Sequence, residues 1–409
     1  MRAVLAVLLL GACGKASDSV VEEPDPLWDC GVLGSLADPP TDGFDPTTLP
    51  DDVEAIDLGV VSTSCGLAEP VPFDVPGDAT SVTLLLFGHP GTLTVPALVV
   101  DPEGQRLAGI DPRAGSSLTS GVLVSPLEEA NPGFPRAHRA SMVVPNNDGV
   151  RLIPGRWALQ VGSIAQLVRG QSLVAEGLTS AVHAWVLVRR GELHEGSLDL
   201  ALHLSGSAGL TSAGAPHDPD VQGALDALET AFGPVGVHIG EVTYHDLPDG
   251  WDGSLYLDLP TCATSPELDA LLAAPVEVQP GALNVFFVHD LACDVFGTNL
   301  LEGAAGLSNG LPGTPFTGHD GVVVSTRWMT DAPDIWAKVL AHEAGHYLGL
   351  FHTSEQVPGR HDPLADTPEG PSDNLMYWYA AEAPDGFLLT PEQGRVIRRH
   401  PLVRPLESP

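Results

Sequence analysis

One segment, residues 342–352, constrains this 409-residue chain more than any other part of it. It reads His-Glu-Ala-Gly-His-Tyr-Leu-Gly-Leu-Phe-His, the pattern H-E-x-x-H-x-x-G-x-x-H. On a helix His342 and His346 are four residues apart, so both imidazoles project from one face toward a shared metal ion. Gly349 can take the left-handed conformation that ends a helix, and the turn lets His352 arrive as a third ligand. Three protein nitrogens leave a fourth position open, which is typical of a catalytic zinc site.

Glu343 directly follows the first histidine, close enough to act on a zinc-activated water without being a ligand. Zinc lowers the pKa of a bound water to about 7, and a nearby carboxylate can take its proton as general base. The surrounding sequence predicts a largely apolar, buried helix over residues 334–349. The apolar residues in it and directly after it are Ile335, Trp336, Val339, Leu340, Tyr347, Leu348 and Leu350. The segment therefore predicts a site for metal-assisted hydrolysis.

The eleven residues of this motif resemble the metzincin clan of metallopeptidases, whose members also have a methionine-containing turn further along the chain. Such a turn is present at residues 373–378, Asp-Asn-Leu-Met-Tyr-Trp. Residues 361–368, His-Asp-Pro-Leu-Ala-Asp-Thr-Pro, resemble the pappalysin or cytophagalysin branch of the clan. Three upstream segments are similar to the same branch: residues 302–308, 311–313 and 321–324. The resemblance covers roughly residues 200–409.

The resemblance implies a metzincin-like α/β (α+β) domain over residues 206–409, with a twisted sheet and a zinc-binding helix, acting as an endopeptidase on proteins or peptides. Met376 would lie beneath the metal as a hydrophobic floor. Several metzincins carry a tyrosine two residues after this methionine, but here Trp378 occupies that position, between Tyr377 and Tyr379. Either tyrosine supplies a hydroxyl to the zinc or the oxyanion if the turn is shifted, or the aromatic residues only pack.

A second function of a different class is also open, a metzincin-fold binding or adhesion lipoprotein that is catalytically silent. A silent homologue is free to lose the general base, and Glu343 is present in this chain. The active zinc endopeptidase is therefore favoured.

The N-terminus predicts export. Residues 1–12 have one positive charge and then a short small and apolar run, the pattern of a signal peptide. The sequence Leu-Gly-Ala-Cys at 10–13 resembles a bacterial lipoprotein box, so a lipidated Cys13 would anchor the chain to the outer membrane or cell surface, with residues 13–49 as a tether. Ordinary secretion with a free Cys13 is the alternative. No other stretch approaches about 18 continuous apolar residues, so no transmembrane helix is predicted.

Four cysteines remain after Cys13, an even number that favours disulfides in an exported protein. Pairing within each half, Cys30 with Cys65 and Cys262 with Cys293, is the most economical of the three possible arrangements. Alternatively, Cys30 and the two residues after it resemble the segment whose thiolate blocks zinc in some metzincin zymogens.

The chain carries 53 acidic and 18 basic residues, a net charge of −35. This charge argues against nucleic-acid binding, which needs a basic surface, and favours solubility outside the cell. Asp362, Asp366 and Asp373 are near enough to the motif in sequence to be candidate calcium ligands.

Residues 50–205 are predicted to form an all-β accessory domain, a β-sandwich. Its clearest strands are rich in valine and leucine and lie at 80–87, 93–100, 155–161 and 182–188. No catalytic motif is found there, so substrate or surface binding, a spacer and a pro-domain all stay open. The catalytic half is predicted to contain strands at 198–204, 235–242 and 282–288, and helices at 218–232, 334–349 and 391–400.

Overall fold

The computed structural model describes most of the chain, as two compact units. The described residues are 30, 35–108, 130–131, 137–169, 172–251, 253–257, 265–274, 281–292, 294–295, 298–299, 305–355, 360–367, 369–370, 373–378 and 388–406. Within them, residues up to 42 and 51–191 form the first unit, called the β unit below. Residues 43–50 and those from Glu192 onward form the second, the α/β unit.

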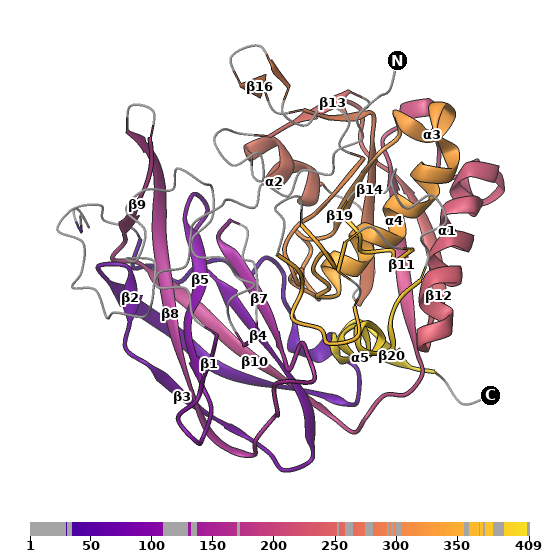
Figure 1. Cartoon of the computed structure of the whole chain (residues 1–409). Helices are drawn as coiled ribbons and strands as arrows, with labels where there is room; N and C mark the ends of the chain where they lie inside the picture. The colour runs from indigo at the N-terminus through magenta and orange to yellow at the C-terminus, as the bar shows by residue number, and fades with distance from the viewer. Residues whose placement is uncertain are drawn as a thin grey trace. The chain divides into compact units, whose positions relative to one another are not determined.

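In its described residues, the β unit is a ten-stranded antiparallel sheet with the main order β6-β5-β8-β2-β1-β10-β4-β7 (Figure 1). β3 and β9 both pair with β8. Strand β1 joins the two halves of the sheet, because its residues 53–62 pair with β10 and its last two residues with β2. The strands are β1 (Val53–Ser64), β2 (Leu67–Ala68), β3 (Val71–Val75), β4 (Ala79–Phe87), β5 (Leu93–Val100), β6 (Arg106–Ala108), β7 (Arg139–Val144), β8 (Gly155–Arg169), β9 (Ser172–Gly177) and β10 (Ala181–Arg190).

One hydrophobic core lies between the two halves of this sheet. Phe73 of β3 and Trp157 of β8 contribute from one half, and Leu84, Met142 and Val186 contribute from the other. Trp157 is 1% exposed, and its indole Nε1 donates to the carbonyl of Ile153 at 2.7 Å, so burial leaves its polar atom satisfied. Because these antiparallel strands enclose a single core, the prediction of an all-β domain is confirmed.

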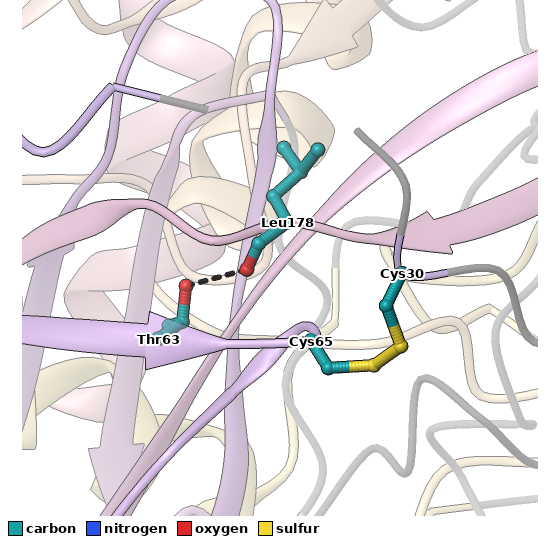
Figure 2. Close-up of a disulfide and its surroundings, with 4 residues drawn as sticks. All are labelled: Cys30, Thr63, Cys65 and Leu178. Carbon is teal, nitrogen blue, oxygen red and sulfur yellow. Dashed lines mark hydrogen bonds between the residues drawn. A yellow bond between two sulfur atoms is a disulfide. The ribbon is translucent and has the colours of Figure 1, made fainter. Parts of the chain in front are cut away.

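Cys30 and Cys65 form a disulfide in the β unit, with a Cα–Cα distance of 4.9 Å (Figure 2). Two residues before Cys65, the hydroxyl of Thr63 donates to the carbonyl of Leu178 at 2.8 Å, which holds the end of β1 in place. The predicted local pairing is confirmed for this bridge. The zymogen alternative is wrong, because the Cys30 sulfur is used in the disulfide. Cys13, Cys262 and Cys293 lie outside the described residues.

The α/β unit contains a mixed sheet of six described strands in the order β12-β11-β14-β19-β18, with β20 also paired to β11. β12, β11, β14 and β19 run parallel, and β18 is antiparallel beside β19. The strands are β11 (Gly196–Leu204), β12 (Val237–Asp246), β14 (Ala282–Val288), β18 (Gly306–Ser308), β19 (Val322–Ser325) and β20 (Arg404–Pro405). Two further pairs are β13 (Ser254–Tyr256) with β15 (Asp290–Ala292), and β16 (Asp294–Val295) with β17 (Thr298–Asn299).

Five α-helices are described, all in the α/β unit: α1 (Pro219–Phe232), α2 (Pro266–Leu272), α3 (Trp328–Asp331), α4 (Pro333–Tyr347) and α5 (Pro391–Arg399). Short 3-10 helices are η1 (Pro46–Thr48), η3 (Ser207–Gly209), η4 (Ala215–His217) and η5 (Gly233–Val235). None of the helices in the described part of the chain is long and apolar enough to cross a membrane.

Successive side chains of β14 point to opposite faces of the sheet, and both faces are covered. Phe287 packs against Trp336 of α4, with ring centroids 5.9 Å apart, while Phe286 belongs to a core cluster with Leu268 and Leu271 of α2. The indole Nε1 of Trp336 also donates to the carbonyl of Ser325 at 2.8 Å. Helix α4 is therefore fixed to the sheet by both apolar packing and a buried hydrogen bond. The expected α/β domain with a histidine-bearing helix is confirmed.

One expected boundary needs correction. The predicted β domain ended at residue 205, but Gly196–Leu204 forms β11, which pairs in parallel with β12 and β14 of the α/β unit. The compact units divide after Gly191. The expected strand at 198–204 of the catalytic half is therefore present as β11, and only the end of the β domain at residue 205 changes.

Candidate metal centre

Helix α4 supplies two of the three histidines, and its C-terminal end places the third. The helix begins at Pro333, where a missing backbone N–H costs no hydrogen bond. After Tyr347 the chain turns, with the N–H of Gly349 donating to the carbonyl of His346 at 2.9 Å and that of Leu350 to Gly345 at 2.9 Å. Gly349 has a φ of +105°, a conformation that favours glycine, so the sequence prediction of its role is confirmed.

The turn brings His352 back to the two helical histidines. Its Nε2 lies 3.1 Å from the Nε2 of His346 and 3.3 Å from the Nε2 of His342. These three nitrogens form the one cluster of at least three metal-ligating side chains found among the described residues, with donor atoms all within 4.8 Å of one another. All three rings are buried, with at most 5% of each residue exposed. The cluster has donors suited to a metal ion such as zinc.

The other ring nitrogens fix the orientation of these imidazoles. The Nδ1 of His342 lies 2.8 Å from the carbonyl oxygen of Leu375, and that of His346 lies 2.7 Å from the carbonyl oxygen of Leu350. Since a carbonyl oxygen can only accept, each Nδ1 carries the proton and each Nε2 keeps its lone pair for a metal. Burial lowers the pKa of His342 to about 3, with a smaller contribution from His352, so its imidazole is neutral at physiological pH.

The third histidine has a different partner. The Nδ1 of His352 lies 3.3 Å from Oε2 of Glu355, a carboxylate whose side chain is 17% exposed. The motif did not identify Glu355, although a residue three positions after a ligand in a tight turn is a natural place to look for such a partner.

Glu343 is buried beside the edge strand β18, with 2% of the residue exposed. A Cβ atom added to Gly306 of β18 would lie 2.5 Å from Cγ of Glu343, 2.9 Å from its Oε1 and 2.8 Å from Val339. The strand therefore passes so close to α4 that only glycine leaves room for this carboxylate. Gly306 belongs to a segment that the family resemblance had singled out, but its contact with Glu343 is visible only in the structure.

The methionine turn packs against the middle of the motif. Met376 is fully buried, and a Cβ atom added to Gly345 would lie 2.6 Å from its sulfur. Within the turn, the N–H of Tyr377 donates to the carbonyl of Asn374 at 3.1 Å and the N–H of Met376 to its side-chain Oδ1 at 2.9 Å. The N–H of Thr353 donates to the carbonyl of Met376 at 3.0 Å. The turn is thus connected to the segment that carries the third histidine.

The aromatic residues after Met376 are only partly described. Tyr377 is 5% exposed, with its ring centroid 6.3 Å from that of Trp378. Tyr379 lies outside the described residues. A role for either hydroxyl at the metal stays a prediction.

The three aspartates considered as calcium ligands do not form a ligand cluster in the described part of the chain. Oδ1 of Asp362 accepts from the hydroxyl of Thr367 at 2.5 Å, and Oδ2 of Asp366 accepts from the N–H of Glu392 at 3.0 Å. Asp373 is exposed. Burial raises the pKa of Asp362 to about 7. The first two aspartates therefore order the loop between His352 and the methionine turn, and nearness in sequence did not bring the three together.

Comparisons with known proteins add little to this geometry. No protein-family model and no curated protein matches the chain. Among solved structures it is similar to metalloproteinase-II from Bacteroides fragilis, with a TM-score of 0.29, 13% identity, and coverage of 53% of this chain and 59% of that one. It is also similar to a family two carbohydrate esterase from Clostridium thermocellum, with a TM-score of 0.15, 9% identity, and coverage of 57% and 64%. The three histidines and their surroundings are therefore the features that indicate function.

Proposed function

We propose that the chain is a zinc-dependent endopeptidase. The observation that carries the proposal is the convergence of three buried imidazole Nε2 atoms, with a buried glutamate on the same helix as two of them. Three histidines with outward Nδ1 hydrogen bonds are a donor set that fits zinc and leaves a coordination position for chemistry. The Cys30–Cys65 disulfide supports a location in an oxidising compartment outside the cytoplasm.

Bound zinc would acidify water and polarise the carbonyl of the scissile peptide bond. Glu343 would take a proton from the attacking water; its position after His342 on the same helix and its burial beside β18 support this role. The same carboxyl group then donates that proton to the leaving amine. The low exposure around Glu343 keeps the proton on this path and strengthens its interaction with the developing charges.

The direct test is to purify the protein, measure its zinc content and assay cleavage of casein. About one zinc per chain is expected from a single three-histidine site, with cleavage abolished by 1,10-phenanthroline and restored by added zinc. A protein that contains no zinc, or one that cleaves casein equally well after chelation, would contradict the proposal. Zinc binding with no cleavage of any protein tested would favour the catalytically silent binding protein instead.

Gly306→Ala is expected to lower kcat for casein or peptide cleavage by about 10- to 100-fold, because the new methyl group displaces the Glu343 side chain. Zinc content should be unchanged, since all three histidines remain. The matched control is Gly223→Ala in α1, where an added Cβ meets nothing within 4 Å. The control should keep full activity and gain about 0.5–1 kcal/mol of stability. Full activity in Gly306→Ala would show that the close approach of β18 does not position Glu343.

A further inference from the structure

We infer that Glu355 is a positioning residue for His352 that strengthens zinc binding through its negative charge. The inference rests on the proposed zinc peptidase function and extends it to a residue outside the H-E-x-x-H-x-x-G-x-x-H motif. Its basis is the contact of 3.3 Å between Oε2 of Glu355 and Nδ1 of His352.

The three histidines are not held equally. His342 and His346 donate to backbone carbonyls, at 2.8 Å and 2.7 Å, and both lie on a rigid helix. His352 follows the turn at Gly349, so no helix restricts its backbone, and its ring partner is a carboxylate. An anionic acceptor forms a stronger hydrogen bond than a carbonyl and makes the imidazole a better electron donor to a metal. The histidine with the least constrained backbone is therefore the one whose ring partner carries a charge.

Glu355 is itself held in place by the backbone. Its N–H donates to the carbonyl of Arg360 at 2.9 Å. Between His352 and Glu355, Thr353 is tied to Met376 at 3.0 Å, and the hydroxyl of Ser354 accepts from the N–H of Gly370 at 2.7 Å. These three anchors fix the segment on which both His352 and Glu355 lie, so the carboxylate needs little ordering when the metal binds.

Charge gives a second reason for a glutamate at this position. Imidazole carries no negative charge, so three histidine ligands would leave the full positive charge of a zinc ion uncompensated in this buried site. A carboxylate one imidazole away offsets that charge without using the coordination position needed for chemistry. Glu343 has to exchange protons during the reaction, so it cannot serve as a constant counter-charge.

The test is the zinc dissociation constant of Glu355→Gln and Glu355→Ala, measured by competition with a chromophoric chelator. Both variants are expected to bind zinc about 10- to 100-fold more weakly than the wild type. Glutamine keeps an acceptor oxygen but has no charge. The loss of zinc affinity in Glu355→Gln therefore measures the contribution of the charge, and any further loss in Glu355→Ala measures that of the hydrogen bond. The visible spectrum of the cobalt-substituted protein should also shift in both variants, which reports on the ligand field rather than on folding.

The matched control is Glu369→Gln. Glu369 also lies by a histidine, with 3.5 Å between its Oε1 and Nε2 of His361, but its side chain is 79% exposed and His361 is not in the cluster. Its zinc affinity should equal that of the wild type. If the wild type binds zinc tightly and neither Glu355 variant changes the dissociation constant by more than about twofold, the inference is wrong and the proposed function stands. A change that small is well below the loss of affinity caused by removing such a partner. A wild-type protein that binds no zinc would overturn the proposed function and this inference together.

Discussion

Glu343→Gln is expected to lower kcat/KM for peptide cleavage by about 10²- to 10⁴-fold, the usual contribution of a general base. Glutamine has nearly the same shape as glutamate, so it fits the space beside Gly306, but it cannot accept and return a proton. All three imidazoles remain, with the Nδ1 partners of His342 and His346 in the backbone. The zinc content and zinc affinity should therefore stay close to those of the wild type. The substitution should lower kcat and change KM little.

The control for Glu343→Gln is Asp334→Asn, which removes one carboxylate from the exposed first turn of the same helix. It should leave kcat/KM unchanged. Measuring zinc content, KM and kcat on the same preparations separates loss of the metal from loss of the base. If Glu343→Gln keeps both its zinc and its activity, a water is activated without this carboxylate and the assigned role of Glu343 is wrong.

The convergence of the three histidines could be predicted from the sequence because their spacing is local. His342 and His346 depend only on helical geometry, and the return to His352 depends on Gly349, whose φ of +105° the sequence suggested. Local signals also predicted helix α1, where the Asp218 side chain accepts from two backbone N–H groups, and α5, where Thr390 begins a capping box. In each case the determining contacts span only a few residues.

The features missed from the sequence depend on distant partners. β7 is fully buried but begins at Arg139, whose guanidinium is neutralised by Asp42 at 3.2 Å, 97 residues earlier. β1 contains a left-handed Gly59 and few buried residues, so its apolar pattern is weak, and its pairing with β10 defines it. Gly306 likewise acquires its role only when β18 is placed beside α4. A single sequence contains no local signal for such contacts.

Gln393→Ala is expected to destabilise the α/β unit by about 2–4 kcal/mol, because it leaves a buried amide unsatisfied and removes part of a helix cap. Gln393 is fully buried, and its Oε1 accepts from the N–H of Thr390 at 2.9 Å as part of the capping box of α5. The same oxygen accepts from Nδ2 of Asn374 at 2.8 Å, and Nε2 of Gln393 donates to Oδ1 of Asn374 at 3.2 Å. One side chain thus caps a helix and holds the methionine turn.

The consequence should extend to the metal. Asn374 orders the turn through the N–H of Met376, and the carbonyl of Leu375, between them, accepts from His342. Loosening Asn374 therefore disturbs the partner that orients His342, and Gln393→Ala should bind zinc more weakly as well. Urea unfolding of the zinc-free protein, followed by the helical circular dichroism signal, measures stability in the α/β unit, since every described α-helix lies there. Using zinc-free protein keeps metal binding from contributing to the measured stability.

Thr390→Ala separates the two roles of Gln393, because it removes the side-chain cap of α5 and leaves the amide pair intact. This substitution should lower the free energy of unfolding by about 1 kcal/mol and leave zinc affinity unchanged. Glutamate would serve equally well in a capping box, but its carboxylate would face Oδ1 of Asn374 where Gln393 now donates a hydrogen bond. Gln393→Glu should therefore be less stable than the wild type although the cap is kept. The amide pair does not connect α5 to the metal centre if Gln393→Ala lowers the free energy of unfolding no more than Thr390→Ala does, and Gln393→Glu leaves it unchanged.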